Sequence, residues 1–381
     1  MLLLSALLLL GFGPPQSNVA GVAALEKAAA LVQQGKLAEA EQQAQVALSA
    51  RETRAAANSV LGTIRLQQNR PRDAVPYLQQ AIRLNPRLLG AHLNLATAHL
   101  LNNDPGLALD AYDAALKLQP DAIPTLQQAA VIAERLNELE RSLSYWIRAK
   151  KLQPEDPEIL LGFGRVCLRM DLLDDAEPAL TRAAGQRPDD PAYQYTLAAA
   201  KVGKRQYESA QRLLELLVEK RPDDPQLQYG LGAVHYVQGH LDDAARHLQA
   251  SLRLQPGQLA SQYYLALVAR DQGDEPKAIA ALEALLQSHP DHGASCEVLG
   301  GLLMSAHRYA DAEGYLRKAV RLDPASVKAN YQLGLLLTRM GRKDEAAKQL
   351  EVAKGLRKEQ EASSRLQLRL LDPDQIVDRH P

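Results

Sequence analysis

A proline recurs every 34 residues through most of this chain. The eight prolines in phase are Pro86, Pro120, Pro154, Pro188, Pro222, Pro256, Pro290 and Pro324. Proline cannot donate the hydrogen bond that continues a helix, and each of these follows a short stretch such as RLNP (83–86), which is typical of a helix end. Loops tolerate insertions, so a spacing that never slips indicates a repeating unit of fixed structural size.

The stretch 225–258 predicts two helices joined by a tight turn. Asp224 is a good N-cap residue and Pro225 suits the first helical position. Gly239 can adopt the left-handed conformation that ends the first helix, and Pro256 closes the second. The apolar positions recur at helical spacing, at Leu227, Leu231 and Val234 and then at Leu241, Ala244, Ala245, Leu248 and Leu252. The unit is therefore a helix, a turn and a second helix.

Ten such units follow when the chain is aligned on its prolines. Their ranges are 21–54, 55–88, 89–122, 123–156, 157–190, 191–224, 225–258, 259–292, 293–326 and 327–360. In eight units the turn position tolerates a positive φ, being Gly35, Asn69, Asn103, Asn137, Asp171, Gly239, Gly273 or Gly341. Arg205 and His307 are the exceptions. The twentieth position is alanine in every unit except at Ser142, which predicts a close crossing of two helices.

Short helices of this kind predict a stack of hairpins. Isolated helices below about 12–15 residues are marginal in water, and each hairpin exposes an apolar face that only a neighbouring hairpin can cover. The length agrees, since 381 residues exceed the roughly 250–300 that one hydrophobic core usually holds. The predicted fold class is all-α, an α-solenoid of about ten 34-residue helix-turn-helix units.

At these positions the sequence resembles the tetratricopeptide repeat (TPR) family. The family pattern has a Leu-Gly or Leu-Ala pair in the first helix, a small residue in the second helix and a closing proline. The pairs here are Leu61-Gly62, Leu95-Ala96, Leu197-Ala198, Leu231-Gly232, Leu265-Ala266, Leu299-Gly300 and Leu333-Gly334. The resemblance covers residues 21–360 and implies a right-handed superhelix whose first helices line a concave groove. Such proteins hold peptides or partner proteins and rarely catalyse reactions.

The resemblance also implies which residues of the first helices face the groove. The candidate partner-binding residues are Arg165, Arg169, Tyr195, Tyr229, Tyr236, Tyr263, Arg270 and Tyr331. Tyrosines beside arginines are typical of recognition surfaces, because rigid amphipathic rings give contact area at low entropic cost. The alternative is that tyrosine at the fifth position of this repeat is half-buried filler.

The remaining patterns favour folding over chemistry. No glycine-rich phosphate loop, HExxH or GxSxG motif is present, and no catalytic domain fits in the 41 residues outside the repeats, so we expect no enzymatic activity and no cofactor. Lys plus Arg (44) balance Asp plus Glu (45), which argues against a nucleic-acid partner. We expect no small-molecule substrate. The acidic PDDP stretches are interpreted as helix caps.

Two histidine pairs and two cysteines have simple interpretations. His289 and His292 flank Pro290 in a weak zinc motif, and we expect no metal there. His92 and His99 lie seven residues apart on one helix face and are interpreted as satisfied packing histidines. The two cysteines are interpreted as small buried hydrophobes too far apart for a disulfide; they are Cys167 and Cys296.

Both ends of the chain differ from the repeats. Residues 1–20 are predicted to be a signal peptide or an apolar N-terminal segment, because the run LLLSALLLL (2–10) suits the apolar region of a secretory signal and is shorter than the about 20 residues of a membrane span. No Lys or Arg precedes the run, so an apolar helix packed on the first repeat is the alternative. Residues 361–381 are predicted to form a C-terminal capping helix and a frayed tail.

Two functional hypotheses follow. The first is a non-catalytic scaffold that binds a peptide or partner protein in the groove and, when exported to the periplasm or the outside of a bacterial cell, assists envelope or secretion-related assembly. The second is an accessory subunit of an enzyme complex, membrane-anchored through a retained N-terminal segment or cytoplasmic. Membrane contact is expected only if that segment is retained.

Overall fold

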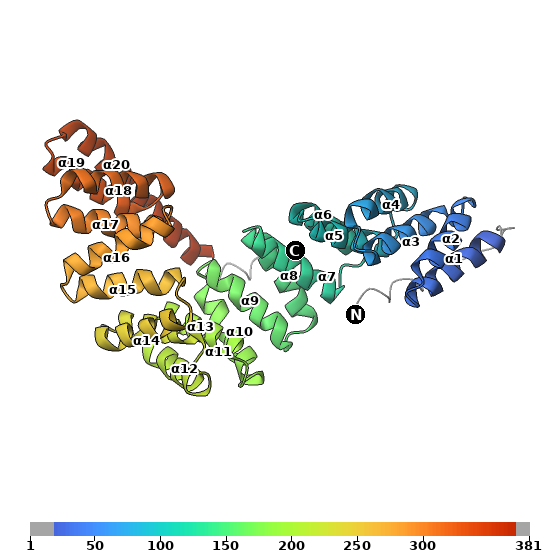
Figure 1. Ribbon diagram of the computed structural model, residues 1–381, viewed down its shortest axis with the longest axis horizontal. Helices are drawn as coiled ribbons and strands as arrows, with labels where there is room; N and C mark the ends of the chain where they lie inside the picture. Colours follow the sequence, from blue (N-terminus) through green and yellow to red (C-terminus); the bar gives the residue numbers. More distant parts are fainter. Residues whose placement is uncertain (1–18, 371–381) are drawn as a thin grey trace, which may run out of the picture. The chain divides into compact units, whose positions relative to one another are not determined.

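The computed structural model describes residues 19–370, and every regular element in this range is an α-helix (Figure 1). The chain divides into two compact units, residues 1–204 and 205–381, which are described separately. The predicted signal segment up to residue 18 and the predicted frayed tail from residue 371 lie outside the described residues.

The first unit consists of stacked helical hairpins. Its helices are α1 (Val19–Gln33), α2 (Leu37–Leu48), α3 (Arg54–Gln67), α4 (Pro71–Leu84), α5 (Leu89–Leu101), α6 (Pro105–Leu118), α7 (Ile123–Arg135), α8 (Leu139–Leu152), α9 (Pro157–Arg169), α10 (Leu173–Gln186) and α11 (Pro191–Gly203). From α1 to α10 the helices pair as hairpins, and each second helix also packs on the first helix of the next hairpin. Neighbouring hairpins therefore cover the apolar face that each would expose alone.

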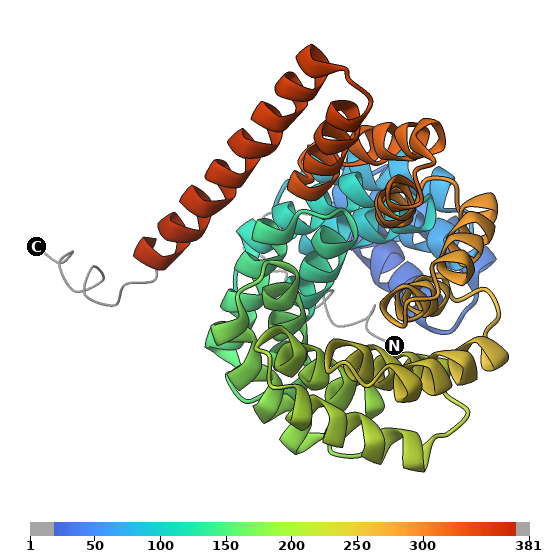
Figure 2. The ribbon, with the colours of Figure 1, turned by 90° about the vertical axis from the view of Figure 1, so that its left-hand side faces the viewer.

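The second unit continues with the same kind of hairpin. Its helices are α12 (Tyr207–Lys220), α13 (Pro225–Val237), α14 (Leu241–Leu254), α15 (Leu259–Asp271), α16 (Glu275–Ser288), α17 (Gly293–Ser305), α18 (Tyr309–Leu322), α19 (Val327–Arg339) and α20 (Lys343–Leu370). Figure 2 shows α20 as one long uninterrupted helix. It reaches into the stretch predicted to cap the stack, but the side chains from residue 361 onward lie outside the described part.

Small residues occupy the predicted helix crossings. Ala40 and Ala244 are fully buried, and the side chain of Ser142 is fully buried too, with its hydroxyl donating to the carbonyl of Ala130 at 2.8 Å. A Cβ atom added at Gly232 would lie 2.8 Å from Cγ of Leu248, inside van der Waals contact. The two helices of a hairpin approach so closely that only a hydrogen, a methyl or a hydroxymethyl group fits.

The hairpin turns share one backbone conformation. All eight residues predicted to tolerate a positive φ adopt one, between 57° at Asn69 and 83° at Gly273. Arg205 and His307 adopt it as well, at 57° and 61°. A left-handed residue with a Cβ costs roughly 1–2 kcal/mol, so at His307 the packing of α17 on α18 imposes a turn that the sequence does not favour.

Candidate functional site

Four tyrosines meet on the first helices of the second unit. Tyr229 and Tyr236 come from α13, and Tyr263 and Tyr264 come from α15. Tyr264 lies in the middle, with its ring centroid 5.9 Å from that of Tyr229, 5.3 Å from Tyr236 and 5.9 Å from Tyr263, each in an edge-to-face arrangement. All four rings are partly buried. These residues, the tyrosine cluster, combine a packed centre with accessible ring surface.

Hydrogen bonds hold one edge of the tyrosine cluster. The Tyr236 hydroxyl donates to Oδ2 of Asp271 at 2.7 Å, and Arg270 donates from Nε to Asp271 Oδ1 at 2.7 Å and from Nη2 to the Tyr236 oxygen at 3.1 Å. Burial and the bond to Asp271 raise the pKa of Tyr236 to about 12, and the bond from Arg270 lowers the pKa of Asp271. At neutral pH the hydroxyl is therefore a neutral donor, and the two charges beside the rings compensate each other.

The predicted row of tyrosines is only partly continuous. Tyr331, on α19, is 51% exposed and makes no ring contact within the described part of the chain. Tyr195 is partly buried on α11 of the first unit. Glu297 interrupts the row and pairs with Lys328, Nζ to Oε1 at 2.6 Å. Among the predicted tyrosines, the structure therefore brings together Tyr229, Tyr236 and Tyr263.

Sequence analysis missed Tyr264. The family pattern assigns groove contacts to the fifth but not the sixth position of the first helix, so Tyr264 was not a candidate. The only signal was the pair of adjacent tyrosines in QYYL (262–265). Tyr263 also contacts His292, with centroids 5.2 Å apart, so the cluster reaches the N-cap residue of α17.

Two arginines of the first unit share one carboxylate. Arg165 donates to both oxygens of Glu134, at 2.9 Å from Nε and 2.6 Å from Nη2. Arg169 donates to the Glu134 carbonyl at 3.0 Å and to Oδ1 of Asn137 at 2.8 Å. The Glu134 side chain is 11% exposed, whereas those of Arg165 and Arg169 are 44% and 39% exposed. The arginine pair thus presents more positive charge than the single carboxylate neutralises.

The PDDP stretches act as helix caps, as predicted. Oδ1 of Asp224 accepts the backbone N–H groups of Gln226 and Leu227, at 2.9 and 3.2 Å. Asp190 caps α11 and Asp156 caps α9 in the same way. A pocket of about 490 Å³ at the loop between α12 and α13 is lined by Lys220, Arg221, Pro222, Asp223, Asp224 and Pro225.

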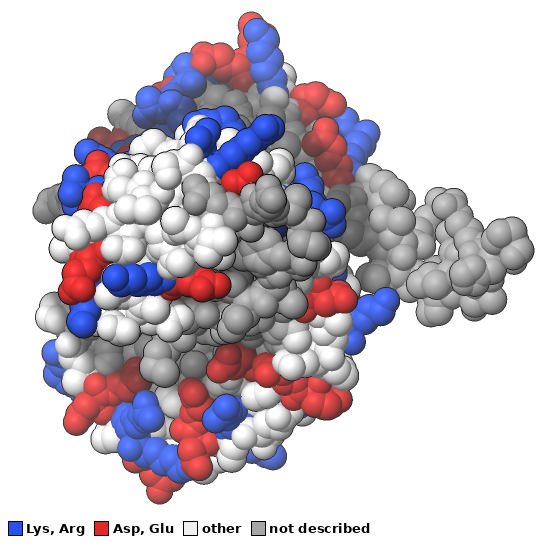
Figure 3. Space-filling view, turned by 90° about the vertical axis from the view of Figure 1, so that its right-hand side faces the viewer, with Lys and Arg blue, Asp and Glu red and all other residues white. Residues whose placement is uncertain are grey.

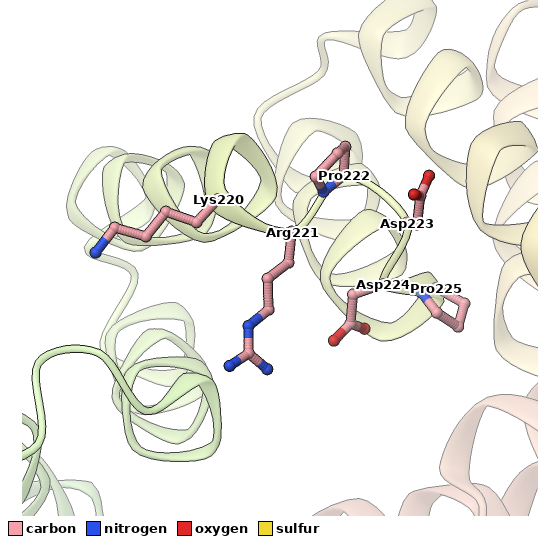
Figure 4. Close-up of a pocket in the computed structure, with 6 residues that line it drawn as sticks. All are labelled: Lys220, Arg221, Pro222, Asp223, Asp224 and Pro225. Atoms are coloured by element: carbon pink, nitrogen blue, oxygen red, sulfur yellow. The ribbon is translucent and has the colours of Figure 1, made fainter.

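This pocket does not assemble catalytic groups. Its residues follow one another from the end of α12 to the start of α13, and Figure 4 shows that Lys220 and Arg221 point away from Asp223. Asp224 is already engaged as a cap. The geometry matches a chain turn between helices, and we assign the pocket no role.

The predicted packing histidines have different outcomes. Nε2 of His92 lies 2.9 Å from the Pro86 carbonyl, which confirms a satisfied packing histidine. His99 is buried, but its Nδ1 has no hydrogen-bond partner among the described residues, so the prediction of a satisfied group is wrong there. Burial lowers the pKa of the His99 imidazole, against the opposing charge of Asp104.

The other predicted metal and thiol residues are held within the fold. Nδ1 of His289 lies 3.0 Å from the Ser288 hydroxyl, and Nδ1 of His292 lies 2.7 Å from the Ser295 hydroxyl. Within residues 19–370 no three His, Cys, Asp or Glu side chains are placed to hold a metal ion. The cysteines are buried and unpaired, as predicted, and burial raises the pKa of the Cys167 thiol to about 12 and that of the Cys296 thiol in the same direction.

Surface charge is mixed on the face shown in Figure 3. Lys and Arg alternate with Asp and Glu there, and neither sign forms a continuous area among the described residues. In the part of the chain that the structure covers, every helix is too short or too polar to cross a membrane.

Comparison with known proteins identifies the family. Residues 59–123, 195–258, 234–293 and 298–361 match a family profile described as tetratricopeptide repeat, and residues 147–200 match a second profile of the same description. These matches cover more than half of the chain, which therefore belongs to the tetratricopeptide repeat family. The predicted all-α TPR solenoid is confirmed. Proteins of this family are generally non-catalytic scaffolds for protein or peptide partners.

Solved structures agree on the fold. A tetratricopeptide repeat protein from Parabacteroides merdae is 17% identical, with a TM-score of 0.52 over 75% of this chain and 100% of that one. A chain of the APC/C hetero-tetramer Cut9–Hcn1 is 16% identical, with a TM-score of 0.53 over 72% of this chain and 55% of that one. A comparison with curated protein sequences gave no match.

Proposed function

We propose that this protein is a non-catalytic scaffold that binds an extended segment of a partner protein on its first-helix faces. The observation that carries the proposal is the tyrosine cluster, whose rings are partly exposed yet held by Tyr264 and by the bonds of Tyr236. Rings that are ordered before binding lose little entropy when a partner docks. Tyr229 and Tyr263 are the main contacts, with Tyr236 and Arg270 beside them and Tyr331 as a further contact on α19.

The charges around the tyrosine cluster and around the arginine pair favour different side chains of the partner. Arg270 is compensated by Asp271 and Lys328 by Glu297, so the surroundings of the tyrosine cluster suit an uncharged segment with apolar or aromatic side chains. The arginine pair keeps uncompensated positive charge and suits an acidic side chain of the partner. Tyr195 is a further contact of the first unit.

Peptides selected from a random library on the full chain test the proposal. Changing Tyr229→Ala and Tyr263→Ala together should weaken the Kd of a selected peptide at least tenfold by calorimetry, because each removes ring surface at the centre of the site. The matched control changes Tyr309→Ala and Tyr315→Ala on α18, a second helix, and should leave the Kd within twofold. Equal losses in both variants would make the tyrosine cluster structural and refute this site.

We also propose that the chain is exported and serves envelope or secretion-related assembly. Support comes from the apolar run at residues 2–10, which lies outside the described residues. Mass spectrometry of the protein from its own cell should find a mature N-terminus between Ser17 and Ala24 in a soluble exported fraction. An intact N-terminus in the membrane fraction with an enzyme attached would instead support the accessory-subunit hypothesis.

A further inference from the structure

A buried and a half-buried histidine stack between α13, which carries two of the cluster tyrosines, and α14. His235 of α13 and His247 of α14 lie with ring centroids 5.5 Å apart and planes 12° from parallel, and His240 lies 5.9 Å from His235. His235 is 6% exposed, and its Nδ1 has no hydrogen-bond partner among the described residues. Asp243 and Glu215 favour a second proton on this ring, but burial outweighs them and lowers the pKa of His235.

A hydrogen-bond chain fixes the state of His247. Nε2 of Gln228 donates to the Pro222 carbonyl at 2.9 Å, so Oε1 of Gln228 is the atom that accepts from His247 Nδ1 at 2.8 Å. His247 therefore carries its proton on Nδ1 and is neutral when Nε2 is bare. Through Gln228 it ties α14 to the loop before α13.

The charged groups around the stack nearly cancel. On α14, Asp243 is ion-paired with Arg246, and on α12 the exposed Glu215 accepts a hydrogen bond from Gln211 at 2.7 Å. His240 adds repulsion for a charged His235. Burial is the main cause that lowers the pKa of His235 and of His247. A charged His240 lowers the pKa of His235 further, and a charged His235 lowers the pKa of His247 further. Both rings are neutral in the folded protein at neutral pH.

The stack and the tyrosine cluster share one packed interface. Tyr229, Tyr236 and Tyr264 pack against a buried cluster made of Ala244 and Leu248 of α14 and Val268 of α15, and Leu248 directly follows His247 on its helix. Gly232 lies against Leu248 so closely that α13 has no space to shift on α14 without losing contact. Loosening the stack therefore releases the helix that carries two of the cluster tyrosines.

We propose that the His235–His247 stack is an acid-sensitive latch that holds the tyrosine cluster in its binding arrangement at neutral pH and weakens as the pH falls below about 6.5. The proposal rests on the function proposed above and adds its regulation. The direction follows from linkage: both folded-state pKa values are lowered from about 6.5, so the stabilisation is present above that pH and is lost as the pH falls.

Hydrogen exchange on the full chain tests the latch without any ligand. Protection factors for residues 225–254, corrected for intrinsic exchange rates, should fall between pH 7.5 and 5.5 by about tenfold for each histidine that stays neutral. His235→Phe keeps a stacked ring but cannot titrate. Between pH 7.5 and 5.5 its protection factors should therefore fall by about tenfold less than those of the unchanged protein. His247→Gln keeps an amide donor for Gln228 and should show the same relief if His235→Phe does not fold.

The matched control is His307→Asn, which changes an exposed histidine of the same unit to a residue that tolerates a positive φ. Between pH 7.5 and 5.5 the protection factors of residues 225–254 should fall as much in this variant as in the unchanged protein. Equal pH losses in His235→Phe, His247→Gln and the unchanged protein would overturn the latch. Failure of the peptide experiment at pH 7.5 would refute the binding site instead, because the exchange experiment needs no partner.

Discussion

The first helices of the two units are connected by different chemistry. In the first unit α9 reaches α7 through Arg165 and Arg169, which share Glu134. In the second unit α15 meets α13 through the ring of Tyr264 and its edge-to-face neighbours. The repeat sets the spacing between first helices, and the residues at the groove positions decide whether that spacing offers charge or ring surface.

The packing beneath these surfaces is the same in both units. A Cβ added at Gly62 would lie 2.5 Å from Cγ of Leu78, and one added at Gly232 would lie 2.8 Å from Cγ of Leu248. Each pair joins the two helices of one hairpin at its closest approach. Because these contacts hold each hairpin together, the other positions of the first helices are free to differ between units.

Among these substitutions, Tyr264→Ala should lower the free energy of unfolding the most. Removing the central ring takes away three aromatic contacts and leaves space in a partly buried site, which should lower the free energy of unfolding by about 2–3 kcal/mol. Urea unfolding followed by circular dichroism measures the change. Tyr331→Ala is the control, and its half-exposed ring should cost no more than about 0.5 kcal/mol. Equal costs would show that the cluster has no packed centre.

Glu134→Gln should have the smaller effect, in the first unit. It removes the charge that both arginines share, but the arginines are more than a third exposed, so the cost should be about 1 kcal/mol or less. The fluorescence of Trp146 on α8 follows unfolding of this unit. The loss of unfolding free energy caused by Glu134→Gln should be smaller in 1 M NaCl, whereas the loss caused by Tyr264→Ala should not change with salt. A deficit independent of salt would mean that Glu134 acts through packing.

The repeat architecture was predictable because it depends on local and periodic signals. Helix ends, turn residues and the alanine at the crossing each recur every 34 residues. A signal that is ambiguous in one unit can therefore be read from the same position in the other units. His307 shows the limit: it was not expected to adopt a left-handed turn, yet it does so because α17 and α18 pack as a hairpin. The partner of Ser142, the Ala130 carbonyl, likewise emerged only from the fold.

The candidate site was predictable only in part. The positions of Tyr229, Tyr236 and Tyr263 followed from the repeat register, but Tyr264, which organises them, lies one residue outside the pattern. Glu134, which holds the arginine pair, comes from the preceding repeat. Neither contact is periodic, so no count along the chain could reveal it.

The sequence by itself determined the hairpin, its size and its repetition, because helix propensity, capping and turn conformation act over a few residues. Only the tertiary structure decided which side chains meet across neighbouring hairpins. Helix packing brings Tyr236 into contact with Asp271, 35 positions away in the sequence, and His235 into contact with His247, 12 positions away. Charge compensation and ring stacking depend on those distances, which tertiary packing alone sets.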